Sequence, residues 1–219
     1  TENNNFYYKN LLITKNLINC FTKLKKNKLI LVGSSQMYSS KIKKINLNSK
    51  FKYKNSYARF RIDSYKYMKK IKSKFNSNIV MAILFNHDSV HRNKKFLIPR
   101  LIKMIKNKKF KDLEKIYKEN ISSDFSHAED ICSGLNKLIF LKKNPDKLIF
   151  SSNKRTHVND IIKFLLKENK IIYKFNSFKT KMILPIGDNS LTRSLLNWKL
   201  RKNIFVAAKN MNSISYKKN

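Results

Sequence analysis

The sequence predicts an α/β fold with a largely parallel sheet. Short apolar runs that suit buried strands alternate along the 219 residues with longer segments of helical periodicity. The strand-like runs are KLILVGSS at 28–35, NIVMAILF at 78–85 and KLIF at 147–150. Nearly continuous apolar runs are typical of parallel strands that are buried on both faces.

Helical spacing of apolar residues predicts the segments around these strands. The expected helices cover 6–25, 56–75, 96–107, 127–142, 156–167, 189–196 and 203–210. A lysine-rich loop joins the first strand to the second helix. Thr156 is expected to cap the helix that it opens, because a threonine hydroxyl accepts hydrogen bonds from free backbone amides.

Length and composition limit the class of protein. With 42% hydrophobic and 12% aromatic residues the chain can bury a substantial core, and its length suits one domain or one and a half. No apolar run approaches about 18 residues, so no membrane span is expected, and TENNN at the start lacks signal-peptide organisation. Cys20 and Cys132 lie far apart, which indicates two reduced thiols in a cytoplasmic protein.

The charge is strongly positive, with 49 Lys and Arg against 13 Asp and Glu, a net charge of +36. Such a balance first suggests a nucleic-acid or anionic-membrane partner. Arginine accounts for only seven of the bases, however, and lysine recurs along the whole chain together with abundant asparagine and isoleucine. This pattern indicates coding bias, so no specific nucleic-acid partner is expected.

Polar residues follow the predicted strands at the ends where chemistry gathers in parallel sheets. Ser34 comes at the end of the first strand, Asn86 and His87 follow the second, and Tyr57 lies at the start of a helix. In NSYARFR, Arg61 comes one helical turn after Tyr57. The sequence therefore predicts a candidate site at one edge of the sheet.

These motifs resemble the extended short-chain dehydrogenase/reductase proteins that act on nucleotide sugars, above all the GDP-mannose 4,6-dehydratases. GSSQMY is similar to that family's S-T-S-E-L-Y segment, and SYARFR to its P-Y-A-x-x-K segment. ILFNHDSVHR, DFSHAEDIC and GDNSLTRSLLNW resemble further segments in the same order. The resemblance implies a partial Rossmann-type sheet with helices on both faces over residues 1–95. Residues 96–219 would be a mixed segment that includes a small substrate-binding portion, interleaved with the last strands.

The resemblance also implies roles for single residues. In the family, a tyrosine takes the proton from the sugar 4-hydroxyl while hydride leaves C4, and a lysine one turn on lowers the tyrosine pKa. Tyr57 stands at the tyrosine position, and Arg61 stands at the lysine position. Arginine keeps the positive charge of lysine, but its planar guanidinium places the proton donors differently from a flexible ammonium. Ser34 matches the hydroxyl residue that bonds the reacting oxygen.

Gln36 departs from the family pattern. It stands where the dehydratases carry the glutamate that takes the C5 proton. An amide cannot accept that proton at neutral pH. Elimination of water is therefore expected to be impaired even where hydride transfer survives.

By the same resemblance the cofactor is NADP, contacted by Tyr57, Arg61, His87 and Arg92, with Asn86 on the substrate side. Family members begin with a strand, a G-x-x-G-x-x-G turn and a helix whose N-terminus holds the cofactor pyrophosphate. The three glycines here are Gly33, Gly134 and Gly187, which form no such turn. The 219 residues by themselves are therefore expected to bind NADP weakly, either as a fragment of a longer protein or as a natural chain that does not hold a dinucleotide in the usual way.

Each candidate also has a purely structural explanation. Tyr57 would be a surface tyrosine with an incidental Arg61, Ser34 would cap a turn, His87 would bond the backbone, and Arg92 would be a solvated charge. His127 and Asp130 are expected to serve packing and hydrogen bonding at a helix start rather than a metal site. Trp198 is expected in the core. The family's R-P-x-E-V-D stretch, which helps to hold the nucleotide, corresponds to FKTKMI at 178–183.

The expected function is nucleotide-sugar 4,6-dehydratase-like chemistry, impaired by Gln36 and Arg61, in a protein that acts on a nucleotide sugar and is compatible with a homo-oligomer. Two alternatives stay open. The first is a catalytically inactive protein of the epimerase/dehydratase fold, and the second is a basic nucleic-acid-binding domain.

Overall fold

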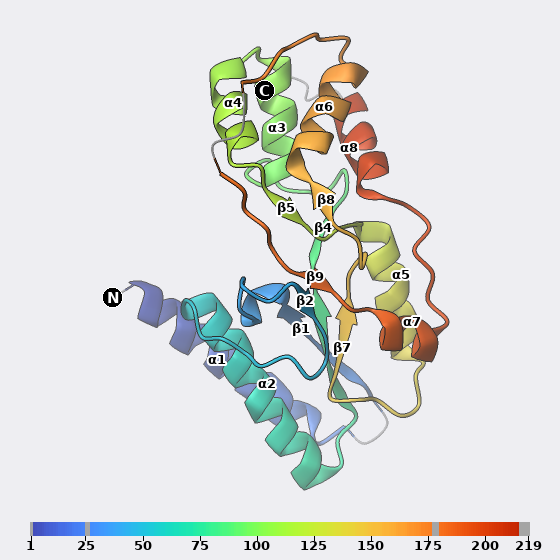
Figure 1. Cartoon of the computed structure of the whole chain (residues 1–219). Helices are drawn as coiled ribbons and strands as arrows, with labels where there is room; N and C mark the ends of the chain where they lie inside the picture. Colours follow the sequence, from blue (N-terminus) through green and yellow to red (C-terminus); the bar gives the residue numbers. More distant parts are fainter. Residues whose placement is uncertain (1, 25–26, 177–179, 215–219) are drawn as a thin grey trace.

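The computed structural model of the chain describes residues 2–24, 27–176 and 180–214 (Figure 1). Its helices are α1 (Glu2–Phe21), α2 (Ser56–Phe75), α3 (Leu97–Lys106), α4 (Phe110–Lys118), α5 (Ala128–Ile139), α6 (Val158–Glu168), α7 (Ser190–Leu196) and α8 (Ile204–Ser213), with a short 3₁₀ helix η1 (Ser35–Met37). Its strands are β1 (Leu29–Ser34), β2 (Lys44–Ile45), β3 (Ile79–Leu84), β4 (Asn86–Asp88), β5 (Ser122–Ser123), β6 (Phe125–His127), β7 (Lys147–Phe150), β8 (Thr156–His157) and β9 (Ile186–Gly187). None of the described helices is long and apolar enough to cross a membrane.

The largest sheet contains the three predicted strands, in the order β1-β3-β7 and all parallel. Ile79 to Leu84 of β3 pair on one side with β1, and Met81 to Leu84 pair on the other side with β7. β3 reads IVMAIL, and all but its last residue are buried. A strand that is apolar on both faces needs cover on both, and the helices supply it.

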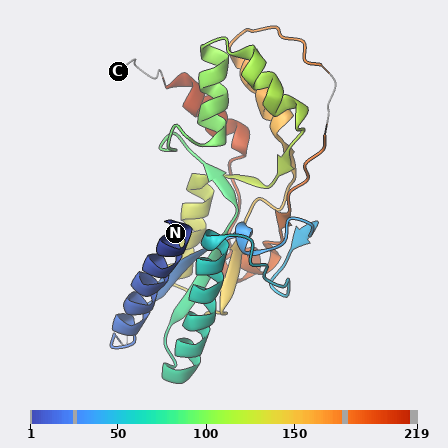
Figure 2. The ribbon, with the colours of Figure 1, turned by 90° about the vertical axis from the view of Figure 1, so that its left-hand side faces the viewer.

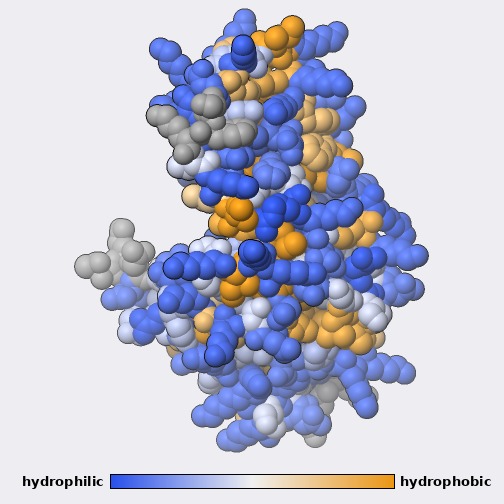
Figure 3. Space-filling model, viewed as in Figure 1, coloured by the Kyte–Doolittle hydropathy of each residue, from blue (hydrophilic) through white to orange (hydrophobic). Residues whose placement is uncertain are grey.

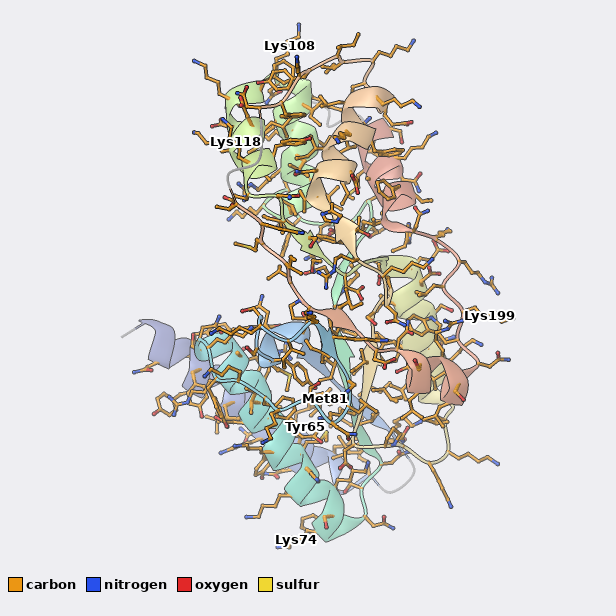
Figure 4. All side chains as sticks on the ribbon, viewed as in Figure 1. Tyr65, Lys74, Met81, Lys108, Lys118 and Lys199 are labelled. Atoms are coloured by element: carbon orange, nitrogen blue, oxygen red, sulfur yellow. The ribbon has the colours of Figure 1, made fainter. Side chains whose placement is uncertain are left out.

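Helices cover the two faces of this sheet, which confirms the predicted α/β fold class. On one face α1 and α2 pack against side chains such as Leu31 and Met81, and Tyr65 of α2 points toward Met81 (Figures 1 and 4). On the other face α5 and the segment around α7 bury Val80, Ala82 and the ring of Trp198. Trp198 therefore lies in the core, as predicted.

A second apolar cluster lies above the sheet in Figure 1, among α3, α4, α6 and α8. The chain passes from the sheet into this part through β4, which pairs in parallel with β6, and through the antiparallel pair β5 and β8. β7, α5 and α7 return to the lower part, so segments after residue 96 interleave with the sheet. The boundary at residue 95 stays a prediction.

Several local predictions need correction. Thr156 does not cap a helix: it pairs with Ser123 in the β5–β8 ladder, and α6 begins two residues later after His157, whose side chain makes no capping bond. Helix α4 was not expected from the sequence. Its apolar stripe is short, and only Leu113 and Tyr117 are buried. The first helix also begins earlier than the predicted residue 6.

Gly134 permits the close packing of α5 on the sheet, and this packing leads to a testable expectation. A Cβ atom at Gly134 would lie 2.8 Å from the Phe150 ring and 3.0 Å from the Trp198 ring. We expect Gly134→Ala to lower the free energy of unfolding by about 1–3 kcal/mol, because overpacking outweighs the better helix propensity of alanine. Urea unfolding would measure it, with exposed Ser133→Ala in the same helix as the control, expected within about 0.5 kcal/mol. Equal stabilities of the two variants would contradict the packing argument.

Candidate active site

Ser34 and Gln36 lie together where β1 ends. Ser34 is the N-cap of η1, and its Oγ accepts a hydrogen bond of 3.2 Å from the Gln36 backbone N–H. Ser34 therefore caps a turn, as its purely structural explanation predicted. A hydroxyl that accepts one bond still carries a proton to donate, so the Ser34 O–H stays able to bond a substrate oxygen. The Gln36 side chain is exposed.

Tyr57 and Arg61 lie on the first two turns of α2, and Arg61 contacts β1 near its end. Asn55 caps this helix by accepting a 2.8 Å hydrogen bond from Ala58 N–H, which fixes where the helix starts. The Arg61 guanidinium carbon lies 5.3 Å from the centre of the Tyr57 ring and 4.6 Å from that of Phe60. Arg61 is thus not an incidental neighbour: it stacks on the tyrosine, and its Nη1 donates to the carbonyl of Val32 in β1.

Asn86 and His87 follow β3 directly and form β4. Both hydrogen bonds donated by the Asn86 amide go to neighbouring segments, at 2.9 Å to Ser123 Oγ and 3.0 Å to the Asp124 carbonyl. Its carbonyl oxygen is left to accept. His87 Nδ1 lies 2.8 Å from the Phe85 carbonyl, so the backbone contact expected as its structural explanation is present. With Nδ1 donating, the neutral ring leaves Nε2 as an acceptor.

Arg92 is held by a buried carboxylate and is not a freely solvated charge. Its Nε lies 2.8 Å from Asp88 Oδ1, and its guanidinium carbon lies 3.5 Å from the centre of the Phe96 ring. Asp88 is only 5% exposed. Burial raises the pKa of Asp88 to about 6, and the Arg92 charge opposes this rise. The pair fixes Arg92 beside β4.

Asp124 was not singled out from the sequence, although it stands first in DFSHAEDIC. It is fully buried, and its carboxylate accepts four hydrogen bonds. The donors are Ser152 N–H and Oγ–H, both at 2.7 Å, Asn153 N–H at 3.0 Å and Gly187 N–H at 3.1 Å. Burial raises the pKa of Asp124, and these donors oppose the rise. One carboxylate thus ties the loop after β7 to β9 and to the β5–β6 segment.

The remaining polar candidates have structural roles. His127 Nδ1 caps α5 by accepting from Glu129 N–H, and Asp130 Oδ2 accepts from the N–H groups of Arg201 and Lys202. This confirms the helix-start role predicted for His127 and Asp130. Within the described ranges no group of three or more His, Cys, Asp or Glu could hold a metal ion. Cys20 and Cys132 are free and exposed.

The fit to a nicotinamide cofactor is partial. The hydroxyls of Ser34 and Tyr57 suit the reactive end of such a molecule. All three glycines of the sequence lie inside the fold, and none adopts a positive φ angle. A glycine turn around a pyrophosphate is therefore absent from the described residues. In the nucleotide-holding stretch predicted at 178–183, residues 178 and 179 lie outside the described part of the chain.

A family model described as GDP-mannose 4,6 dehydratase matches residues 2–211. The chain belongs to this family. The resemblance noted in the GSSQMY, SYARFR and LFNH segments is thereby confirmed at the family level. No curated protein matches the sequence.

Several solved structures share the fold of this GDP-mannose 4,6-dehydratase family member. UDP-glucuronic acid 4-epimerase from Bacillus cereus, in complex with NAD, has a TM-score of 0.79 at 16% identity, over 93% of this chain and 66% of its own. RMD from Pseudomonas aeruginosa, complexed with NADPH, has a TM-score of 0.77 at 15% identity, and the match covers 93% of this chain and 71% of that protein's chain. dTDP-glucose 4,6-dehydratase from Bacillus anthracis, in complex with NAD, has a TM-score of 0.79 at 13% identity, and the match covers 94% of this chain and 67% of that protein's chain. The family member thus spans about two thirds of the length of these structures, and at these identities the likeness shows the fold alone.

The buried Asp88 predicts a dependence of stability on pH. Its pKa is about 6 in the folded state and 3.8 before folding, so its contribution to stability is fully present below pH 3.8 and is lost as the pH rises through about 6. The loss amounts to up to about 3 kcal/mol. We expect the unfolding free energy of the parent, minus that of Asp88→Asn, to decrease as the pH rises from 4 to 7. Urea titrations at several pH values would measure it, and a flat difference would contradict the raised pKa.

The bonds of Asp124 predict a large loss on its removal. Asp124→Ala leaves buried backbone N–H groups without an acceptor, so we expect it to lower the free energy of unfolding by about 3 kcal/mol or more. Asp112→Ala is the matched control, because Asp112 lies on the surface of α4 in a 3.0 Å ion pair with Lys115, and exposed pairs of this kind contribute little to stability. Chemical unfolding of both variants would measure the contrast. A loss at Asp124 as small as that at Asp112 would show that water replaces the carboxylate.

Proposed function

We propose that this chain carries the proton-transfer and substrate-binding part of a nucleotide-sugar oxidoreductase site of the epimerase/dehydratase type. The observation that carries the proposal is the grouping at the end of β1. There Ser34 ends the strand, and Arg61 of α2, which lies over the Tyr57 ring, donates to the carbonyl of Val32 two residues before it, in a chain of the GDP-mannose 4,6-dehydratase family.

Tyr57 is the proposed base. A free phenol has a pKa of about 10 and needs a nearby cation to accept a proton near neutral pH. Arg61, already stacked on the ring, supplies that charge. Ser34 donates a hydrogen bond to the sugar oxygen whose proton passes to Tyr57, and the Asn86 carbonyl oxygen accepts a hydrogen bond from a neighbouring sugar hydroxyl.

A nicotinamide cofactor, when bound, supplies the hydride acceptor for oxidation at the sugar carbon. Two of the structural neighbours contain NAD and one contains NADPH, so we propose a nicotinamide cofactor and, by the family resemblance, NADP. His87 Nε2 and Arg92 lie on β4 and just after it, and they are the proposed cofactor contacts of this chain. The Asp88 pair holds the Arg92 guanidinium in place for such a contact.

The finer proposal is 4,6-dehydratase chemistry with a weak elimination step. Abstraction of the C5 proton needs a base, and Gln36 offers only an amide at the position of that base. Losing a positioned base costs roughly 10²–10⁴-fold in rate. We therefore propose that oxidation proceeds and that dehydration of the sugar, GDP-mannose by resemblance, is slow.

Two alternatives remain. An inactive member of the family is favoured by the Val32 carbonyl that holds Arg61 and by Gln36. A nucleic-acid-binding domain has only the charge of +36 in its favour. The labelled Lys74, Lys108 and Lys199 project from opposite parts of the molecule, and hydrophilic residues cover most of the face in Figure 3, so the bases do not gather on one groove (Figures 3 and 4).

The test uses a fusion protein. It joins the 219 residues, in one polypeptide, to the part of the B. anthracis dehydratase that lies outside the matched region. The assay contains either NADP or NAD, together with GDP-mannose, UDP-glucuronic acid or dTDP-glucose as substrate. We expect Tyr57→Phe to lower the rate of cofactor reduction at least about 100-fold. Tyr67→Phe in the same helix is the control, since its hydroxyl bonds only Asn19 at 2.6 Å. Gln36→Glu should raise 4-keto-6-deoxy sugar formation more than cofactor reduction, and Arg61→Lys should raise both. Absorbance of the reduced cofactor and product chromatography measure the two steps, and equal rates for the parent and Tyr57→Phe, or no turnover by the parent, would contradict the proposal.

A further inference from the structure

A cavity lies between β6, the loop that joins β7 to β8, and the first turn of α8. Its volume is about 420 Å³, which is within the usual range for small-molecule sites. Helix α8, red in both views, packs beside β4 and β6 (Figures 1 and 2). Among the described residues that line this cavity, none belongs to the candidate active site. We call it the β6–α8 cavity.

Two buried carboxylates hold the walls of the β6–α8 cavity together. Asp124, directly before β6, accepts hydrogen bonds from Ser152 N–H and Oγ–H, both at 2.7 Å, and so holds the loop after β7. Asp130 of α5 accepts from the N–H groups of Arg201 and Lys202, at 2.9 and 2.8 Å, and so holds the segment before α8. The walls are therefore tied to the rest of the fold without a ligand.

Ser126 lines the β6–α8 cavity with a hydroxyl group that the fold does not use. The residue is only 2% exposed, and its Oγ has no hydrogen-bond partner within the described part of the chain. Folded proteins rarely leave a buried hydroxyl without a partner. Ser152 on the opposite wall differs, because its Oγ donates to Asp124 and accepts from Lys154 N–H. Ser126 is therefore the polar group that a ligand in this cavity would satisfy.

The first turn of α8 adds backbone donors to the cavity. Asn203 caps this helix, and its side chain accepts from Val206 N–H at 3.2 Å. Ile204 and Phe205, the first two residues of α8, both line the cavity. Their N–H groups have no partner inside the helix, because the first turn of any helix lacks the preceding carbonyls. Free N–H groups and the helix dipole together favour a phosphate group at this position.

The charged side chains around the β6–α8 cavity are all basic. Four bases line it, and no Asp or Glu is among its described lining residues. Two of the bases have other partners: Lys202 pairs with Glu129, and the Arg155 guanidinium donates to backbone carbonyls. The side chains of Lys154 and Arg201 are exposed and have no acidic partner among the described residues. These two cations are left to meet an anion.

The remaining lining is largely apolar and indicates a ligand larger than an inorganic ion. The apolar residues are Phe125, Leu200, Ile204 and Phe205. A phosphate ion by itself would leave these side chains uncovered. A phosphate ester that carries a ring or a short carbon chain would place its anion at Ser126 and its apolar part against them. Burial of that apolar part would add to the affinity.

We propose that the β6–α8 cavity binds an organic phosphate monoester. The Ser126 hydroxyl and the N–H groups of Ile204 and Phe205 donate hydrogen bonds to the phosphate oxygens, and Lys154 and Arg201 balance the charge. The binding is non-covalent. It uses none of the residues assigned to proton transfer or cofactor contact, so it goes beyond the proposed function and does not rest on it.

Phenyl phosphate is the probe, and inorganic phosphate and phenol are its two parts. Backbone amides are followed by NMR during titration in physiological salt, which screens attraction to exposed lysines. We expect the amide signals of Ser126, Ile204 and Phe205 to shift. Phenyl phosphate should bind at least about 10-fold more tightly than either part, because only the ester fills both halves of the cavity. The titration needs no nucleotide sugar or nicotinamide cofactor, so its failure is distinct from failure of the proposed function.

Three variants make the test specific. Ser126→Ala should weaken phenyl phosphate binding about 10-fold, because it removes a hydrogen bond to a charged group. Its urea midpoint should stay the same or rise, since the hydroxyl has no partner in the free protein. Arg201→Ala should weaken binding about 3-fold. Lys199→Ala is the matched control, because Lys199 is an exposed cation of the same segment outside the cavity lining, and its removal should leave the affinity unchanged.

Four results would overturn the proposal. Amide shifts that spread over the surface without Ile204 and Phe205 would show that the net charge of +36 alone attracts the probe. An equal loss of affinity for Lys199→Ala and Arg201→Ala would show the same. Binding by Ser126→Ala that matches the parent would remove the hydroxyl from the site. A lowered urea midpoint of Ser126→Ala would show that the hydroxyl serves the fold instead.

Discussion

The pairing of β3 with β1 on one side and β7 on the other is the interaction on which the rest of the structure depends. Three segments that are far apart in the sequence are placed in parallel, so their carboxyl ends come to the same edge. Ser34 and the β4 segment lie at that edge for this reason alone. Because the strands are apolar on both faces, the same pairing requires helices on both sides of the sheet, and α2, which carries Tyr57, packs on one of these faces.

Polar residues inside the fold hold this edge in a fixed shape. Asp124 gathers four donors from the loop after β7 and from β9, and Asp88 holds Arg92 after β4. Such bonds are strong where water is excluded, and each unsatisfied group there is costly. These two buried carboxylates thus tie together the segments that follow β3 and β7.

The candidate residues show how a side chain can serve structure and chemistry together. Ser34 accepts a bond from η1 and keeps its proton, while Asn86 donates twice and keeps its carbonyl oxygen. Arg61 makes two contacts at once, since it donates to the Val32 carbonyl and lies over the Tyr57 ring. The chemical capacity of the site depends on what the structural bonds leave unused.

The sequence alone determined the fold class, the three main strands, most helices and the family, because these follow from local periodicity and from motifs at fixed spacing. It also predicted Ser34, Tyr57 and Asn86 as a group, since the ends of parallel strands converge, and the place of Tyr57 in that group stays a prediction. Tertiary structure decided the rest. Thr156 became a strand residue because Ser123 lay within pairing distance, and Asp124 became central because three distant segments met around it. The Val32 contact of Arg61 joins α2 to β1, which no local pattern in either segment encodes.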